Sequence, residues 1–322
     1  MKKNISFIVI GKNEAKTLVK SIQSIFNVQK ELLQDYESEI IYVDSGSEDD
    51  SADLASSSGY VDKVYVLDGE VNAAIARNVG ADNSNGSILC FLDADMFLYR
   101  QCFFEILGKI ETGGEDFVSS DLIDIEYDRF GNVQRQSKRY KVAVNRYETT
   151  TGGFFVIKKS AWDLVGGMKN AFRRNQDLDL GLRLAKNGIK LLRVSCTAVR
   201  HHTIAYTSPY RFFADARKGN FLYPGVLLRR NFFNKSAHRY LLKRYLSSML
   251  LLASIFLTIF YLNFSVLSAY FISWSVIILA RSLKPARLVN DLLMRFLVDL
   301  SFFLGFLLFF PKNNYKYNLF KV

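Results

Sequence analysis

The chain has 322 residues, of which 42 are Lys or Arg and 31 are Asp or Glu. That length allows one sizeable domain with a smaller part attached. The three cysteines, Cys90, Cys102 and Cys196, show neither a zinc-ligand spacing nor a paired framework. We therefore expect reduced thiols in a cytosolic domain, which excludes the small disulfide-stabilised and zinc-ribbon classes.

The formal net charge of +11 is not spread evenly, because basic residues become frequent between Arg211 and Arg244, just before an apolar C-terminal third. Anionic lipid head groups explain that position better than nucleic acid does. We therefore expect membrane lipids as partners and no nucleic acid. The N-terminal Met-Lys-Lys precedes an apolar run, 5–10, that is too short for a secretory signal, so the catalytic part is expected in the cytoplasm.

Short apolar runs alternate with amphipathic segments through the first half of the chain, as buried parallel strands alternate with helices. The expected strands are 7–10, 40–43, 63–67 and 88–92, and the expected helices are 13–26, 50–58 and 72–82. This alternation predicts a doubly wound parallel α/β sheet.

The next segment, 122–147, is less regular and basic, which is typical of an antiparallel excursion or a loop over a site. An apolar run at 154–157 then leads into a helix that begins at Ser160. A second amphipathic helix is expected at 177–187, where Gly188 ends it.

The last third is apolar over 245–262, 264–280 and 292–310. The first two segments are about long enough to cross a hydrocarbon core, for which roughly 20 apolar residues suffice, and basic residues flank the pair on both sides. We expect a helical hairpin with both flanks in the cytoplasm, in a multi-pass protein of the inner (plasma) membrane. The third segment carries Arg295 and Asp299 at a spacing that allows them to pair, and it either spans the membrane or lies at its surface.

Polar and acidic residues follow three of the expected strands, at 11–14, 44–45 and 93–95. Ligands of such sheets bind beyond the carboxyl ends of the strands. A carboxylate there can hold Mg2+ or Mn2+, which would neutralise a substrate diphosphate. The competing interpretation is that such acidic strand ends only cap the helices that follow.

Successive blocks of the sequence resemble the inverting family 2 glycosyltransferases of the GT-A fold, from about Ser6 to His202. In chain order the blocks are Gly11-Lys12-Asn13-Glu14, Val43-Asp44-Ser45-Gly46-Ser47, Ala76-Arg77-Asn78-Val79-Gly80, Asp93-Ala94-Asp95, Gly152-Gly153-Phe154-Phe155 and Gln176-Asp177-Leu178-Asp179-Leu180. With the composition, the resemblance predicts a GT-A (Rossmann-like) catalytic domain over 1–207, a basic aromatic interfacial segment over 208–244, and C-terminal transmembrane helices within 245–322.

The resemblance implies a role for each matching position. It places the nucleotide sugar on Gly11, Asn13, Glu14, Asp44, Ser45, Arg77 and Asp93, and the acceptor on Gly152, Gly153 and Gln176. It also implies a divalent metal, Mn2+ or Mg2+, on Asp95, and Asp177 as the base that takes the proton of the acceptor hydroxyl. Many family members have a histidine beyond this block, so we expect His201 rather than His202 to complete the metal site.

The sequence departs from the family pattern at two places, since Gly11-Lys12 replaces the usual Pro-Thr-Tyr and Gln176 replaces the usual Glu. We therefore expect nucleoside stacking and acceptor recognition to differ from the commoner members. Asp179 is a second candidate base, and Asp177 as a mere charge on the helix dipole is the competing interpretation. Arg217 and Lys218 are expected to grip an acceptor phosphate, with membrane adhesion as the alternative.

The sequence thus predicts an inverting, metal-dependent transfer from a nucleotide-diphosphate sugar, with a UDP-sugar favoured, to a lipid-linked or membrane-proximal glycan in cell-envelope polysaccharide biosynthesis. The alternative is a catalytically inactive membrane scaffold that binds nucleotide sugars, against which the intact Asp95 and Asp177 argue. A dinucleotide-dependent oxidoreductase is disfavoured, because no Gly-x-Gly-x-x-Gly follows the first strand.

Overall fold

The computed structural model of the chain describes residues 3–32, 35–128, 130–204, 214–281 and 285–322. The chain forms two compact units, one of residues 1–208 with 312–322 and the other of residues 209–311. The strands are β1 (Lys3–Gly11), β2 (Tyr36–Asp44), β3 (Lys63–Gly69), β4 (Ile88–Asp93), β5 (Met96–Leu98), β6 (Phe117–Tyr127), β7 (Val133–Lys138), β8 (Arg146–Glu148), β9 (Phe155–Lys158), β10 (Leu191–Ile204) and β11 (Tyr317–Lys321). The helices are α1 (Leu18–Leu32), α2 (Ser51–Ser57), α3 (Ala73–Asp82), α4 (Arg100–Glu111), α5 (Lys159–Leu164), α6 (Gln176–Lys186), η1 (Asn220–Leu222), α8 (Tyr223–Arg230), α9 (Lys235–Arg244), α10 (Leu246–Tyr261), α11 (Ser265–Arg281) and α12 (Pro285–Leu307).

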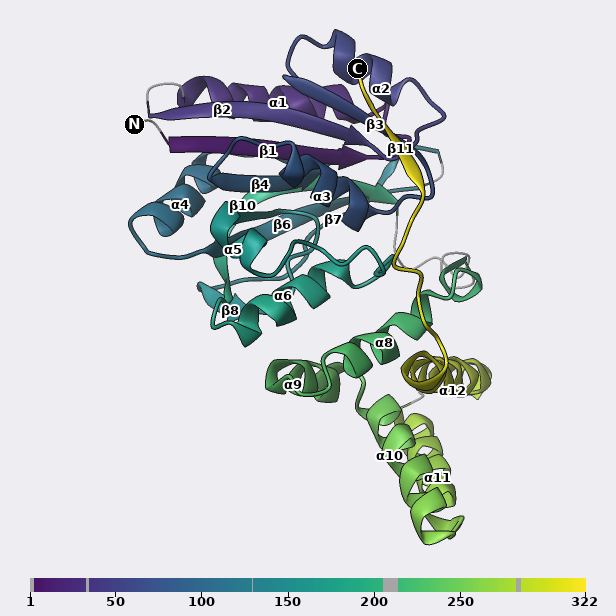
Figure 1. The fold of residues 1–322 in the computed structure, drawn as a ribbon. Helices are drawn as coiled ribbons and strands as arrows, with labels where there is room; N and C mark the ends of the chain where they lie inside the picture. The colour runs from purple at the N-terminus through teal and green to yellow at the C-terminus, as the bar shows by residue number, and fades with distance from the viewer. Residues whose placement is uncertain (1–2, 33–34, 129, 205–213, 282–284) are drawn as a thin grey trace. The chain divides into compact units, whose positions relative to one another are not determined.

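The first unit is built on one mixed sheet in the order β11-β3-β2-β1-β4-β9-β6-β10-β5, with β7 beside β6 and β8 beside β10 (Figure 1). β1 runs parallel to β2 and β4, and β2 runs parallel to β3, so the predicted parallel sheet is confirmed for this half. β9 lies between β4 and β6 and is antiparallel to both. The parallel prediction concerned the first half only, and of the two interpretations of 122–147 the antiparallel one agrees with β7, which pairs antiparallel with β6.

Helices cover both faces of this sheet, as the predicted two-sided burial requires. Apolar residues of α1 and α4 join one core cluster, and those of α3, α5 and α6 join the other. α3 packs especially close to β1, because a Cβ on Gly80 would lie 2.3 Å from the Ile8 Cγ2 atom. Asn72 begins α3 by accepting hydrogen bonds from the amides of Ala74 and Ile75.

The structure places residues 312–322 with the first unit, whereas the sequence had assigned them to the membrane region. β11 pairs antiparallel with β3, and Lys312 forms an ion pair with Glu70. Gly69 permits this approach, since its φ is +114° and a Cβ there would lie 2.7 Å from the Lys316 carbonyl oxygen.

The expectation that all three cysteines are reduced thiols was wrong for two of them. Cys102 in α4 and Cys196 in β10 form a disulfide with their Cα atoms 5.6 Å apart, while Cys90 is free and buried. The two residues are 94 positions apart in the chain. A pairing over that distance leaves no spacing signal, because the fold of β10 beside α4 brings the residues together.

The second unit contains α8 to α12. A buried carboxylate, Asp299 of α12, accepts hydrogen bonds from Ser247 of α10 at 2.8 Å and Tyr270 of α11 at 2.7 Å, and so joins the three helices. Arg295 Nε lies 3.5 Å from the Asp299 carboxylate, which confirms the predicted pair. Among the described residues no single helix is both long and apolar enough to cross a bilayer, and α9 with α10 meets that requirement only as a pair bent by 107°.

Candidate active site

Three of the predicted site residues lie on one rim, at the carboxyl ends of neighbouring parallel strands. Gly11 at the end of β1 is in register with Asp44 of β2, and Ile10 is in register with Asp93 of β4. Gly11 has no room for a side chain, because a Cβ would lie 2.9 Å from the Ala94 Cβ and from the Tyr42 hydroxyl. The loop after β1 therefore lies directly against the Asp93–Asp95 turn.

The first two loops of this rim are shaped by side chains that were predicted to bind the nucleotide, and Asn13 joins the two loops. Asp44 is only 1% exposed, and its carboxylate accepts hydrogen bonds from the Ser47 amide at 2.7 Å and from the Tyr42 hydroxyl at 2.9 Å. Asn13 takes a left-handed conformation with φ 58°, and its side-chain oxygen accepts from the Glu48 amide at 2.8 Å. These contacts shape the rim, and direct contact of Asn13, Asp44 and Ser45 with a nucleotide stays a prediction.

Arg77 and Asp93 form an ion pair at this rim. Arg77, on α3, is 4% exposed, and its Nη2 atom lies 2.5 Å from the Asp93 Oδ1 atom. The second carboxylate oxygen of Asp93 lies against the Gly152–Gly153 backbone, since a Cβ on Gly153 would come within 2.1 Å of it. Any side chain at position 153 would therefore collide with Asp93.

β5 and β10 bring together Asp95 and His201, which are far apart in the sequence. β5 follows Asp95 directly, and its antiparallel pairing with β10 sets Met96 opposite His201. The His201 Nε2 atom consequently lies 3.1 Å from Asp95 Oδ2. The other oxygen, Asp95 Oδ1, is buried and has no hydrogen-bond partner among the described residues.

A second carboxylate holds the far side of the His201 ring. The Asp124 Oδ1 atom, on β6, is 2.8 Å from the His201 Nδ1 atom, and Arg139 donates to Asp124 from Nε at 2.7 Å. Arg139 Nη2 also lies 2.7 Å from His201 Nδ1. The Asp124 carboxylate can only accept, and the hydrogen bond from His201 lowers its pKa, so we assign His201 Nδ1–H as the donor to Asp124 Oδ1. Burial would raise the pKa of Asp124, but the hydrogen bonds from His201 and Arg139 outweigh it and hold that pKa below its ordinary value.

This arrangement fits a divalent cation held by two protein ligands. A histidine whose Nδ1–H is fixed by a carboxylate presents Nε2 to a metal, and Asp95 offers an unpaired oxygen beside it. No group of three His, Cys, Asp or Glu residues able to hold a metal occurs in the parts of the chain that the structure describes. Protein-bound Mg2+ usually keeps several waters and takes ligands from substrate phosphates.

His202, the alternative ligand, points into a different environment. Its Nδ1 atom lies 2.7 Å from the Tyr127 hydroxyl, and its ring packs 4.2 Å from the ring of Phe97, measured between centroids. Burial lowers the pKa of His202, so a neutral imidazole is favoured there. His201 is thus the one of the two that contacts Asp95 through its side chain.

Glu14 adds a further carboxyl to the acidic rim. It is half-buried, and burial together with the nearby Asp95 charge raises the pKa of Glu14 to about 7. The Glu14 backbone amide donates to Ser51 at 2.9 Å, which fixes the loop that carries it.

The predicted base, Asp177, is held by the same backbone that Asp93 touches. Asp177 lies in the first turn of α6, and its Oδ2 atom accepts from the Thr150 hydroxyl at 2.6 Å and from the Gly152 amide at 3.1 Å. The described residues place no hydrogen-bond donor on the other oxygen, Oδ1. Asp177 and Asp93 therefore flank the Gly152–Gly153 dipeptide, with one carboxylate oxygen of Asp177 left open.

The other candidate base, Asp179, is 2% exposed and pairs with Arg183 at 2.7 Å, so it faces the interior of the domain. Gln176 begins α6 beside Asp177. Arg217 and Lys218 are exposed residues of the second unit, and their predicted grip on an acceptor stays a prediction. The first residues of the predicted interfacial segment, 208–213, lie outside the described residues.

The sequence analysis did not identify four residues that hold the candidate site residues in place: Asp124, Arg139, Thr150 and Arg193. Most of them carry no local signal, because they act through contacts between distant strands. Arg193 is the exception, since a single arginine in the apolar run Leu191-Leu192-Arg193-Val194 is unusual and could have been noticed.

Comparison with known proteins decides the family. The family model described as "Glycosyl transferase family 2" matches residues 6–175, which is more than half of the chain. The chain belongs to glycosyl transferase family 2. It is therefore a glycosyltransferase with a mixed α/β fold of the GT-A type. The matched region ends just before Asp177 and does not reach His201, so those two assignments depend on the geometry described above.

Relatives of this family 2 glycosyltransferase share only part of their length with it. Glycosyltransferase AglE of Haloferax volcanii is 27% identical over 150 residues, which cover 46% of this chain and 45% of that protein. Polypeptide N-acetylgalactosaminyltransferase 6 of Homo sapiens is 23% identical over 243 residues, which cover 64% of this chain and 38% of that protein. The chain thus spans less than half the length of these relatives.

A solved structure supports the fold. The crystal structure of GalNAc-T7 with UDP, GalNAc and Mn2+ superposes with a TM-score of 0.52 at 16% identity, covering 73% of this chain and 51% of that one. At that identity the likeness concerns the fold alone.

Proposed function

We propose that this chain is an inverting, divalent-metal-dependent glycosyltransferase that moves a sugar from a nucleoside diphosphate sugar to a hydroxyl acceptor. The observation that carries the proposal is the placement of Asp177 and Asp93 on either side of Gly152–Gly153. Asp93 lies at the end of β4 on the rim, and Asp177 has a hydrogen-bond donor on only one of its carboxylate oxygens among the described residues. A UDP-sugar is the favoured donor, in keeping with the UDP bound in the GalNAc-T7 structure.

The chain's own residues would act as follows. Asp177 Oδ1 accepts the proton of the acceptor hydroxyl, while its Oδ2 stays held by Thr150 and Gly152. The acceptor oxygen then forms the new bond to the anomeric carbon, and the bond from that carbon to the diphosphate breaks with its electron pair leaving on the phosphate. Asp95 and His201 would hold a divalent cation, which would supply positive charge to the departing diphosphate.

A panel of nucleotide sugars tests this proposal, with detergent-purified protein, Mn2+ or Mg2+, and the Asp177→Asn variant. We expect metal-dependent release of a nucleoside diphosphate from one donor, lost on chelation and reduced at least about 100-fold in Asp177→Asn. Tight metal-dependent donor binding without turnover, in the presence of candidate lipid and glycan acceptors, would favour the inactive scaffold.

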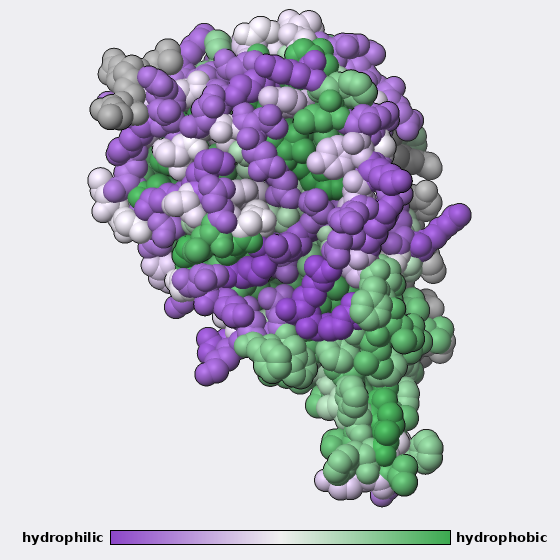
Figure 2. Space-filling view, in the orientation of Figure 1, coloured by the Kyte–Doolittle hydropathy of each residue, from purple (hydrophilic) through white to green (hydrophobic). Residues whose placement is uncertain are grey.

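We further propose that the second unit attaches the enzyme to a membrane, so that its acceptor is lipid-linked or membrane-proximal. The sequence has no Asp, Glu, Lys, Arg or His between Arg244 and Arg281. Large apolar side chains are exposed along α10 and α11, and Figure 2 shows hydrophobic residues gathered over these helices. At about 1.5 Å per residue, helices of 16 and 17 residues reach about 24–26 Å, close to the roughly 30 Å of a hydrocarbon core.

Flotation with vesicles of phosphatidylcholine and phosphatidylglycerol tests the attachment. We expect the protein to float, and a Leu257→Asp, Phe260→Asp double variant to partition at least about tenfold less, because each charge costs about 2.5–3.5 kcal/mol in hydrocarbon. Leu164→Asp, at an apolar side chain that is 59% exposed in the first unit, is the matched control and should float like the wild type. Equal flotation of all three would end the proposal.

The basic flanks of the hairpin lead us to propose that the catalytic unit faces the cytoplasm. A disulfide such as Cys102–Cys196 is unusual in that compartment, so the orientation needs a direct test. Impermeant reagents added to intact cells should fail to label a cysteine introduced at the exposed Lys12, whereas labelling there would place the unit outside.

A further inference from the structure

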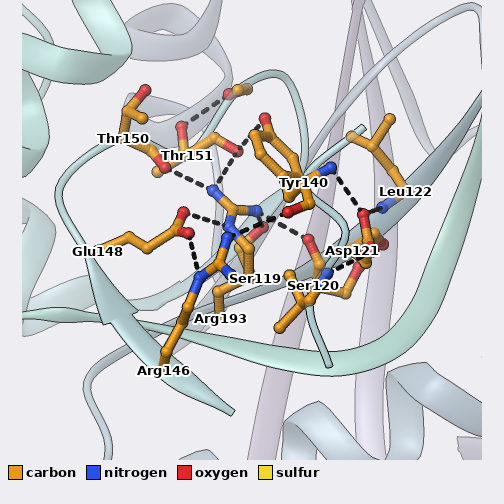
Figure 3. Close-up of polar contacts among 12 residues, drawn as sticks. Ser119, Ser120, Asp121, Leu122, Tyr140, Arg146, Glu148, Thr150, Thr151 and Arg193 are labelled. Atoms are coloured by element: carbon orange, nitrogen blue, oxygen red, sulfur yellow. Dashed lines mark hydrogen bonds and ion pairs between the residues drawn. The ribbon is translucent and has the colours of Figure 1, made fainter. Parts of the chain in front are cut away.

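The side chain of Arg193, in β10, has no exposed surface. Figure 3 shows its guanidinium surrounded by polar partners. A charge buried in this way is strongly unfavourable unless every donor finds a partner. Its partners are Glu148 Oε2 at 2.5 Å, Ser119 Oγ at 3.1 Å, and the carbonyl oxygens of Ser120 at 2.7 Å, Thr150 at 2.5 Å and Thr151 at 3.4 Å. The ring of Tyr140 stacks 3.6 Å from the guanidinium carbon.

Most of these partners belong to one short segment, residues 148–152, which we call the strap. The strap lies between Arg193 and α6. Its Thr150 and Thr151 carbonyls point toward Arg193, whereas the Thr150 hydroxyl and the Gly152 amide point toward Asp177 Oδ2. One residue, Thr150, thus contacts the buried guanidinium with its backbone and the carboxylate with its side chain.

The other side of the strap rests on α6 itself. A Cβ on Gly181 would lie 1.8 Å from the Thr149 carbonyl oxygen, so the strap touches the helix backbone one turn after Asp177. The strap is therefore fixed from two sides, by Arg193 and by Gly181. The position of Asp177 depends on that fixation, because both of its hydrogen-bond donors belong to the strap.

We infer that Arg193 and Thr150 are positioning residues for the base. Arg193 holds the strap, and Thr150 holds Asp177 Oδ2, so that Oδ1 stays aimed at the acceptor. The inference rests on the proposed role of Asp177. Small misplacements of a reacting group cost about 100-fold in rate per ångström, so loosening this chain of contacts lowers kcat while leaving donor binding intact.

The test measures kcat and the donor KM for release of nucleoside diphosphate in four single variants. Thr150→Val removes the hydroxyl with little change of shape, and we expect kcat to fall about 10- to 100-fold with an unchanged donor KM. Thr150→Ser keeps the hydroxyl and should stay within about threefold of the wild type. Arg193→Lys keeps the charge but loses the forked donor set, so kcat should fall as in Thr150→Val. Thr112→Val, which removes an exposed hydroxyl at the end of α4, is the control and should match the wild type.

A double-variant comparison separates positioning from general support of the fold. If Arg193 acts through Thr150, adding Arg193→Lys to Thr150→Val should lower kcat less than about threefold further, because the shared contact is already lost. Independent structural damage would instead multiply the two losses. Where Arg193→Lys does not fold, Glu148→Gln replaces it, since it removes the charged partner of the same guanidinium.

Failure of the inference and failure of the proposed function give different results. A fully active Asp177→Asn variant refutes the base and the inference with it. A Thr150→Val variant with wild-type kcat, beside an inactive Asp177→Asn, refutes the inference alone. Equal losses in Thr150→Val and Thr150→Ser would also overturn it, because the hydroxyl would then be irrelevant.

Discussion

Replacing Asp124 with Asn should weaken metal binding without removing either proposed ligand. Asp124 is 6% exposed, and it accepts the Nδ1–H of His201 at 2.8 Å while Arg139 donates to it. Loss of such an outer carboxylate typically costs 10- to 100-fold in metal affinity, or about 1.4–2.8 kcal/mol. The cause is that the imidazole loses both its fixed orientation and part of its basicity.

Titration calorimetry with Mn2+ in the presence of UDP measures this effect directly. Asp116→Asn is a matched control at the other end of β6, since Asp116 pairs with Lys158 at 2.7 Å and contacts no proposed ligand. Thermal unfolding must accompany the titration, because Arg139 loses a charged partner and the fold should lose about 1–3 kcal/mol. If both variants bind Mn2+ as the wild type does, while Asp95→Asn does not, then His201 is not a ligand held by Asp124.

Three further outcomes follow from the structure. Glu14→Gln should stabilise the metal-free protein at pH 8 by on the order of 1 kcal/mol, after allowance for solvent screening, and should stabilise it less at pH 4. The folded pKa of Glu14, about 7, exceeds its ordinary value of 4.5, so wild-type stability falls as the pH rises through that interval. Denaturant unfolding at both pH values measures the difference. Gly181→Ala should lower the free energy of unfolding by about 1–3 kcal/mol and lower turnover, because its methyl group would push on Thr149. Gly108→Ala, within α4 and with open space around it, should raise the free energy of unfolding by about 0.5–1 kcal/mol. Thermal unfolding measures both. Deleting residues 312–322 should lower the unfolding free energy by about 2 kcal/mol, because the β3 edge loses its hydrogen bonds; an unchanged melting temperature would contradict that role for β11.

The parallel half of the fold could be predicted from sequence because its determinants are local. Each strand from β1 to β4 is an apolar run bounded by polar turns, and hydrophobic periodicity marks the helices between them. The helix expected from Asn13 instead begins at Leu18, since Asn13 has a left-handed conformation and uses its side chain to join the next loop. Boundaries that depend on such side-chain contacts leave no periodic signal.

The antiparallel half could not be predicted in the same way. β10 was not anticipated, although it carries both Arg193 and His201, because its residues 191–204 mix apolar, basic and polar side chains and contain a bulge between Val194 and Val199. Its pairing with β5 and β6 is what brings His201 to Asp95 and Asp124. The family resemblance named Asp95 and His201 together, and the pairing of β5 with β10 shows why the His201 ring faces Asp95; metal binding by the two residues stays a prediction.

The Gly152–Gly153 dipeptide joins two parts of the site: Asp93, which ends a strand that could be predicted from sequence, and Asp177, which is held by contacts between distant segments. Gly153 lets Asp93, at the end of β4 in the parallel half of the sheet, approach the backbone that follows the strap. Gly152 has a φ of +74°, and its amide donates to Asp177. A side chain at either position would disturb this arrangement, since one at position 153 would strike Asp93 and one at position 152 would strike the Tyr140 hydroxyl. The two glycines therefore set how close Asp93 and Asp177 lie to the same backbone, and under the proposed mechanism Arg193, which holds the strap, would act on the chemistry without touching the substrate.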